Sequence, residues 1–187
     1  QMVVECRDIA YQATQGRKNR IFEKKKDSDM IKEVLKAYGS VKVDATTYQH
    51  PEMVQYYCSD WDFALSRADA NGLFICTDGK DIKVFKPKVS GSPVLTVTYG
   101  MDLIDFDGGL SGSEQYAKYE AVSWDPATQK QVKQTASAPS LNDQGDIAIK
   151  KLAGDDNQLL QTDAPTDKSA LKEWADSQAL KAGLARY

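Results

Sequence analysis

The sequence has little of the chemistry that metal and redox sites need. Its 187 residues include one histidine, His50, and three cysteines, Cys6, Cys58 and Cys76. The cysteines are odd in number, widely spaced and form no CxxC pair, which argues against a disulfide framework or a structural zinc site. The acidic run at 155–157 lacks the spacing of a calcium-binding EF-hand loop. The sequence therefore predicts no metal, no cofactor, and reduced thiols typical of a protein made in the cytoplasm.

The sequence also lacks long apolar runs and a strong excess of charge. No run approaches the ~20 apolar residues that span a bilayer, and residues at the N-terminus show no basic-then-apolar leader pattern. A net charge of −3 gives no general attraction to nucleic acid or anionic membranes. The basic run Lys24–Lys26 is followed directly by the acidic residues Asp27 and Asp29, so a solvated turn is expected there. We expect neither nucleic-acid binding nor stable membrane insertion.

What is present is an ordinary globular composition, with 41% hydrophobic and 27% charged residues. The chain enters the strand-like run Val3–Cys6 directly after Gln1-Met2, which suggests a piece of a longer protein. Apolar residues at three- and four-residue spacing predict a helix near 29–38, with Ser28 as its N-cap and Gly39 at its end.

A second helix is predicted to begin at Ser59. The run Ser59-Asp60-Trp61-Asp62 matches a capping box, in which the serine hydroxyl accepts from the third amide and Asp62 reaches back. The buried stripe would be Trp61, Ala64, Leu65 and Ala68, and Asn71-Gly72 would end the helix.

A β-hairpin is predicted after this helix. Residues 73–77 and 81–85 flank Asp78-Gly79, a strong two-residue hairpin signal because both positions favour positive φ. Pro87 and residues 90–93 then indicate a linker or a domain boundary.

The second half of the chain has a mainly β pattern. Strands are expected at 94–99, 101–106, 115–124 and 128–135, with a turn at Asp125-Pro126. Residues 138–165 predict a long polar loop with one short strand near 147–149. Thr166 or Asp167 would cap a last helix, whose apolar side is marked by Leu171, Trp174, Ala175 and Ala182. The order indicates an α+β chain and not an alternating βαβ fold.

The search for catalytic groups gives negative results. Cys58, His50 and Asp60 could be imagined as a nucleophile set, but a cysteine at a strand end among aromatic residues is explained by packing. The carboxylates that a glycosidase needs are mostly explained by turns and helix starts. The glycine-rich run 108–112 lacks a Gly-Lys-Ser/Thr ending and a following helix. We therefore expect no catalytic residues and a domain that binds, spans or assembles.

One stretch resembles a known family. Residues 50–72 contain the pattern Q-Y-x-x-[ST]-D-x-x-F, followed by a helix ending in glycine and a hairpin, and residues 122–126 form a similar strand and turn. These features resemble the hub of the VgrG (Rhs-element Vgr) spike family, over roughly residues 1–182. The residues that carry the resemblance are Gln55, Tyr56, Ser59, Asp60, Trp61, Asp62, Phe63, Gly72, Trp124, Asp125 and Pro126.

The resemblance implies a phage baseplate hub-like fold, with a tube-forming β-barrel domain and an α+β insertion domain carrying a hairpin. It divides the chain into the end of a first tube-forming domain (1–22), the α+β domain (23–89), a second tube-forming β domain (90–165) and a helix (166–187). That helix would lead to an OB-fold and needle.

The function implied by the resemblance is structural. Such a hub belongs to a type VI secretion system or a phage-tail-like machine, and links the inner tube to a puncturing needle. The implied partners are two further copies in a homotrimer, a hexameric inner-tube protein, baseplate subunits, and needle-tip or effector proteins. Assembly would be cytoplasmic, with translocation on contraction. Two alternatives stay open: a phage-derived cell-wall hydrolase module, and a carbohydrate- or protein-binding β domain.

Overall fold

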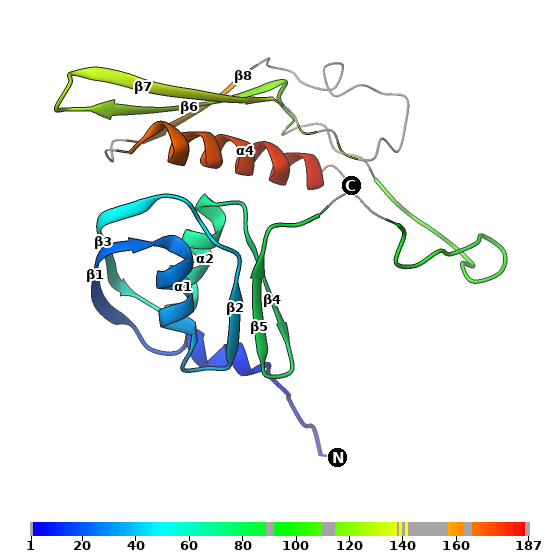
Figure 1. The fold of residues 1–187 in the computed structure, drawn as a ribbon. Coiled ribbons are helices and arrows are strands. Elements are labelled where there is room, and N and C mark those ends of the chain that lie inside the picture. The colour runs from blue at the N-terminus through cyan, green and yellow to red at the C-terminus, as the bar shows by residue number, and fades with distance from the viewer. Residues whose placement is uncertain are drawn as a thin grey trace.

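The computed structural model describes residues 2–88, 92–109, 115–137, 139, 141, 157–162 and 166–185. Its elements are η1 (Ile9–Thr14), β1 (Lys18–Lys26), α1 (Asp27–Leu35), β2 (Ser40–Val43), β3 (Gln49–Cys58), α2 (Asp60–Ala70), β4 (Phe74–Asp78), β5 (Asp81–Phe85), β6 (Lys118–Asp125), β7 (Lys130–Ser137), β8 (Asn157–Thr162) and α4 (Lys168–Leu184). We call residues 2–88 the N-terminal half, residues 92–109 the arm, and the later described residues the C-terminal half (Figure 1).

The N-terminal half is an α+β unit around one core. β1 and β3 form an antiparallel two-stranded sheet, and β2, β5 and β4 form a second sheet in which β2 and β5 run parallel. Helices α1 and α2 fill the space between them (Figure 1). The fully buried apolar side chains of this core include Met30, Ile31, Leu35, Ile82 and Val84.

The C-terminal half packs one helix on one sheet. β6 pairs antiparallel with β7 and parallel with β8, and α4 covers the face of this sheet that looks toward the N-terminal half (Figure 1). Tyr119 and Ala121 of β6 pack against Leu171, Ala175 and Ala179 of α4. The small residues on α4 let the helix axis approach the sheet closely.

Several predicted elements are confirmed. Ser59 is the N-cap of α2, Asp167 is the N-cap of α4, and β4 and β5 form the predicted hairpin, with its turn one residue later than predicted. Because Asp78 pairs with Asp81, the two turn residues are Gly79 and Lys80, and only Gly79 has positive φ. The three cysteines are free thiols, as expected.

Other predictions for the N-terminal half are wrong. Lys24–Lys26 end strand β1 and are not a turn, because antiparallel pairing with β3 extends to Lys26. Helix α1 begins at Asp27 with Lys26 as its N-cap, so Ser28 does not cap it. Val3–Cys6 forms no strand. In α2 the buried positions are Asp60, Phe63, Ala64 and Ala68, whereas Leu65 is exposed.

The predicted β-barrel is also wrong. The described residues form one two-stranded and two three-stranded sheets, none of them closed. Residues 94–99 and 101–106 were expected as strands, but the arm holds only an isolated bridge between Tyr99 and Leu103. A barrel needs every strand paired on both edges, and these runs supply no ladder. β8 lies within the predicted long loop, while the strand expected near 147–149 falls outside the described residues.

Candidate functional site

The strongest cluster of predicted residues surrounds the carboxylate of Asp60. Its Oδ2 accepts from Lys18 Nζ at 2.6 Å and from Tyr38 Oη at 2.8 Å. Its Oδ1 accepts from Arg20 Nη1 at 3.0 Å and from Gln55 Nε2 at 2.9 Å. Asp60 is 1% exposed and Gln55 is fully buried, so this cluster ties β1, β3 and α2 together from inside.

The titration of Asp60 follows from these partners. Burial alone would raise the pKa of Asp60, but the hydrogen bonds from Lys18, Gln55 and Tyr38 and the charge of Arg20 outweigh it and lower the pKa. The same contact with Asp60 raises the pKa of Lys18. Asp60 is also the first residue of α2, where the helix dipole favours an anion. The group is therefore a fixed, ionised anchor.

A bulge in β3 brings these groups together. The pairing register shifts between Lys18 and Arg20, so that three steps of β3 oppose two of β1, and Tyr57 has φ of +44°. The Asn19 side chain accepts from the Tyr57 amide at 2.8 Å and holds the bulge. Bulges re-aim the side chains beside them, and here Gln55 turns inward while Tyr56 stays 81% exposed.

A second buried carboxylate, Asp27, lies at the start of α1. Its Oδ2 contacts His50 Nε2 at 3.0 Å and accepts from Asn71 Nδ2 at 2.9 Å. Its Oδ1 lies 3.2 Å from Arg67 Nε, an ion pair that misses hydrogen-bond geometry among the described residues. Burial alone would raise the pKa of Asp27, but the His50 hydrogen bond, the Arg67 charge and the Asn71 hydrogen bond lower it.

A cavity of about 400 Å³ opens beside Asp27 and lies between the two halves. The N-terminal half lines it with Asp27, Tyr48, His50 and Arg67 among others, and the C-terminal half lines it with residues of β8 and α4 that include Trp174. The Tyr48 ring meets His50 edge-on with centroids 4.7 Å apart.

Within the described residues, this cavity is a place where catalysis could be sought. A general acid or base needs a lone pair or proton that faces the substrate. Both oxygens of Asp27 are instead turned to His50, Asn71 and Arg67, and its lowered pKa keeps it ionised. Cys58 and His50 lie at opposite ends of β3, where they pair with Lys18 and Lys25 of β1. Burial and the nearby Asp62 and Asp60 raise the pKa of the Cys58 thiol. The geometry fits an internal joint between strands and helices.

The remaining predicted residues occupy different surroundings. Phe63 is buried and stacks on Phe22, while Trp61 is only partly buried at the edge of the same core. The Asp62 carboxylate accepts from the Ser59 hydroxyl at 2.7 Å and not from the Ser59 amide as the capping box predicts. The Asp62 amide donates to Ser59 Oγ at 3.0 Å. The predicted aromatic residues do not converge on the cavity beside His50.

The predicted turn at Trp124-Asp125-Pro126 closes the hairpin of β6 and β7. Asp125 Oδ1 accepts from the Ala127 amide at 3.0 Å and Oδ2 from Thr128 Oγ1 at 2.6 Å. These hydrogen bonds, led by the one from Thr128, lower the pKa of Asp125. Trp124 is 52% exposed, so this motif shapes a turn and does not fill a core.

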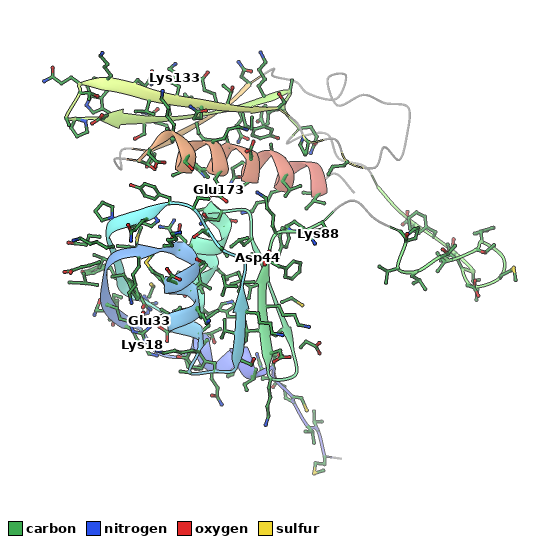
Figure 2. The ribbon with its side chains drawn as sticks, in the orientation of Figure 1. Lys18, Glu33, Asp44, Lys88, Lys133 and Glu173 are labelled. Carbon is green, nitrogen blue, oxygen red and sulfur yellow. The ribbon has the colours of Figure 1, made fainter. Side chains whose placement is uncertain are left out.

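Gly72 has a role that the sequence did not reveal. It follows α2 with φ of +65°, as a helix stop does, and a Cβ placed on it would lie 2.6 Å from Ser177 Oγ of α4. Lys181 of α4 forms an ion pair with Asp69, and Thr47 donates to Glu173 at 2.9 Å. Figure 2 shows Glu173 on the side of α4 that faces the N-terminal half. We call this contact between the halves the α4 seam.

Two classes of site are not found in the part of the chain that the structure describes. No group of three or more His, Cys, Asp or Glu side chains gathers where it could hold a metal ion. No helix within the described ranges is both long and apolar enough to cross a bilayer.

Three solved structures share this fold. The 43 kDa tail protein of prophage MuSo2 from Shewanella oneidensis matches 95% of this chain with a TM-score of 0.60 at 12% identity. The tail protein from Neisseria meningitidis MC58 matches 91% with a TM-score of 0.59 at 11% identity, and prophage tail protein gp18 from Listeria monocytogenes EGD-e matches 83% with 0.54 at 11%. This chain covers 51%, 51% and 48% of those proteins, about half their length.

The comparisons of sequence correct the family resemblance. No curated protein matches the chain significantly. The assignment to the VgrG family is wrong, because the family model that matches is a different one and it accounts for every residue. The short pattern at residues 55–63 describes a strand, a cap and a helix, which unrelated families can share. The family model matches residues 1–187, and the chain belongs to the family described as the Alg8 N-terminal domain.

Proposed function

We propose that this chain is a structural, non-enzymatic part of a phage-tail-like contractile particle, in the hub that joins the inner tube to the puncturing needle. The observation that carries the proposal is the match of its fold, over 95% of its length, to a prophage tail protein. Its proposed partners are other copies of the same protein, the inner-tube protein and baseplate subunits. It would be assembled in the cytoplasm and leave the cell on contraction.

The contacts of the buried carboxylates support the proposal of a rigid scaffold. Asp60 binds two strands and a helix start, and Asp27 binds α1 to β3 and to the end of α2. Because the oxygens of both carboxylates face side chains of this chain, the contacts fix the strands and helices relative to one another. These oxygens are therefore not available for proton transfer to a substrate. Part of a machine that transmits force needs such cross-links between elements.

The proposal is tested by following the protein in the cells that make it. Antibodies against the 187-residue chain should detect it in the fraction where tail-like particles sediment, and should label one end of those particles in electron micrographs. Detection only in free or membrane fractions would contradict the proposal. Sugar transfer or clearing of peptidoglycan in a gel by the purified chain would also contradict the proposal, provided that the Asp27→Asn variant, purified in the same way, lost that activity.

A further inference from the structure

The cavity between the two halves has the size and the position of a ligand-binding pocket. Its volume of about 400 Å³ lies within the range of about 300–1,000 Å³ that small-molecule sites occupy. One wall comes from α1, β3 and α2, and the other comes from β8 and from α4, which faces the N-terminal half (Figure 1). Pockets occur preferentially where two packed units meet. A small molecule bound there would contact both halves.

The charged side chains that line the cavity are neutralised by other groups of the protein. The Asp27 carboxylate lies 3.2 Å from Arg67 Nε and 3.0 Å from His50 Nε2. Asp69, which is exposed, forms an ion pair with Lys181 of α4. A bound anion would lie near Asp27 and a bound cation near Arg67, so neither gains a net electrostatic attraction. The cavity therefore favours an uncharged ligand.

Two polar side chains of the cavity keep hydrogen-bonding capacity that the protein does not use. His50 contacts Asp27 through Nε2, and among the described residues its Nδ1 has no hydrogen-bond partner. In the same part of the chain, the Nη1 of Arg67 meets only the sulfur of Met53, a weak acceptor, at 3.4 Å. The side chains of His50 and Arg67 are 16% and 19% exposed, so both are accessible. A purely apolar ligand would remove water from these groups without replacing its hydrogen bonds.

Two aromatic side chains line the cavity from opposite halves. Tyr48 lies just before β3, and Trp174 lies on α4. The Tyr48 ring is held edge-on against His50. Burial and the nearby Asp167 raise the pKa of the Tyr48 hydroxyl, which therefore stays neutral. Flat aromatic rings beside unused hydrogen-bonding groups match a ligand with apolar faces and hydroxyl edges, and a sugar ring has both.

We propose that this cavity binds one ring of a neutral saccharide. Tyr48 and Trp174 would pack against the C–H faces of the ring, and His50 and Arg67 would form hydrogen bonds with its hydroxyl groups. Because the sugar would contact both halves, it would also stabilise the α4 seam. The inference goes beyond the proposed function and rests on the cavity alone. A particle could contain the protein without a bound sugar, so the two proposals fail separately.

The test is binding of single sugars to the 187-residue chain, measured by saturation-transfer NMR and by titration calorimetry. The probes are glucose, galactose, mannose and N-acetylglucosamine, with glucuronate as a charged counterpart. At least one neutral sugar should bind with a Kd in the millimolar range, because a single ring supplies few contacts. Glucuronate should bind no more tightly than glucose. The neutral sugar that binds should also slow proteolysis at the α4 seam.

Substitutions of tryptophan place the bound sugar. Trp174→Leu keeps an apolar contact with the core of the C-terminal half but removes the flat ring, so the affinity should fall about tenfold. The matched control Trp124→Leu, at a site 52% exposed, should bind like the wild type. Tyr48→Leu gives a second variant of the cavity, with an expected loss of the same size, and circular dichroism should show all three variants folded.

Three results would overturn the proposal. The first is no binding of any of the four neutral sugars, which would mean that the cavity holds water alone. The second is much tighter binding of glucuronate than of glucose, which would show that the cavity selects an anion. The third is a sugar affinity that falls in Trp124→Leu and stays unchanged in folded Trp174→Leu and Tyr48→Leu, which would place the sugar elsewhere.

Discussion

At the scale of single residues, the account rests on buried carboxylates held by ion pairs and hydrogen bonds. Asp60 accepts five hydrogen bonds from four side chains, and three of these side chains lie on strands. Sequence reasoning found Asp60 only as a helix-start residue, because Lys18 and Tyr38 are 42 and 22 positions away in the chain. Local patterns reveal a cap, but they do not reveal which distant cations reach it.

Asp60→Asn tests this anchor. The variant keeps the shape but leaves Lys18 and Arg20 without their anion, so the free energy of unfolding should fall by about 3 kcal/mol, since removal of one partner of a buried pair is strongly destabilising. Urea denaturation measures it. The matched control Asp62→Asn, in the same helical turn but exposed, should change stability by less than about 1 kcal/mol. Equal effects would contradict the anchor role.

The packing residues of α2 provide a second prediction. Phe63 is buried and stacked on Phe22, with ring centroids 5.4 Å apart, so Phe63→Ala should cost about 3–5 kcal/mol of unfolding free energy. Trp61→Ala should cost clearly less, because Trp61 is only partly buried. Thermal melts of the two variants give the ranking, and the reverse order would show that α2 is rotated from its described position.

At the scale of elements, the local start and stop signals predicted well and the pairing of strands did not. Ser59 and Asp167 cap helices through bonds to neighbours within three residues, which a sequence displays directly. β8 was missed because its polar sequence gains its structure from parallel pairing with β6, about 40 residues earlier. The strand predicted at 94–99 has the right pattern for a ladder, but the described chain offers it none.

The α4 seam makes the third prediction. Gly72→Ala combines a strained positive φ with a Cβ that would meet Ser177, so it should lower stability by more than about 1 kcal/mol and expose the seam to protease. Gly79→Ala is the matched control: φ is +61° there, but nothing lies within 4 Å of the added Cβ. Limited proteolysis with melts should separate the two variants. Identical behaviour would mean that α4 does not pack on Gly72.

At the scale of the whole molecule, the buried carboxylates predict a dependence on acid. The pKa values of Asp27 and Asp60 are lowered in the fold, so their stabilisation is complete above the ordinary carboxyl pKa of about 4 and is lost as pH falls through the lowered values. The melting temperature should therefore hold steady from neutral pH to about pH 5 and drop below pH 4. Asp27→Asn/Asp60→Asn should flatten that drop. An unchanged acid slope would contradict the roles given to these two groups.

At this scale, the sequence pattern indicated a structural role, but the family resemblance drawn from it was wrong. Scarce histidine and scattered cysteines indicated a structural role, and the order of the predicted helices and strands indicated an α+β chain. Neither feature pointed to the contacts that Asp27 makes with His50. The closed barrel was inferred from the resemblance to another family, whereas the described residues form three open sheets. A fold of this kind is shared with tail proteins at 11–12% identity, where few individual residues carry the relationship.

The central claim is that this fold is a building block of a tail-like particle, and cryo-electron microscopy of that particle tests it most directly. Density at the junction of tube and needle should accept residues 2–88 as a rigid unit, with the sheet of β6, β7 and β8 and helix α4 beside it. A well-resolved hub in which this fold has no place, from particles that lack the protein by mass spectrometry, would contradict the account.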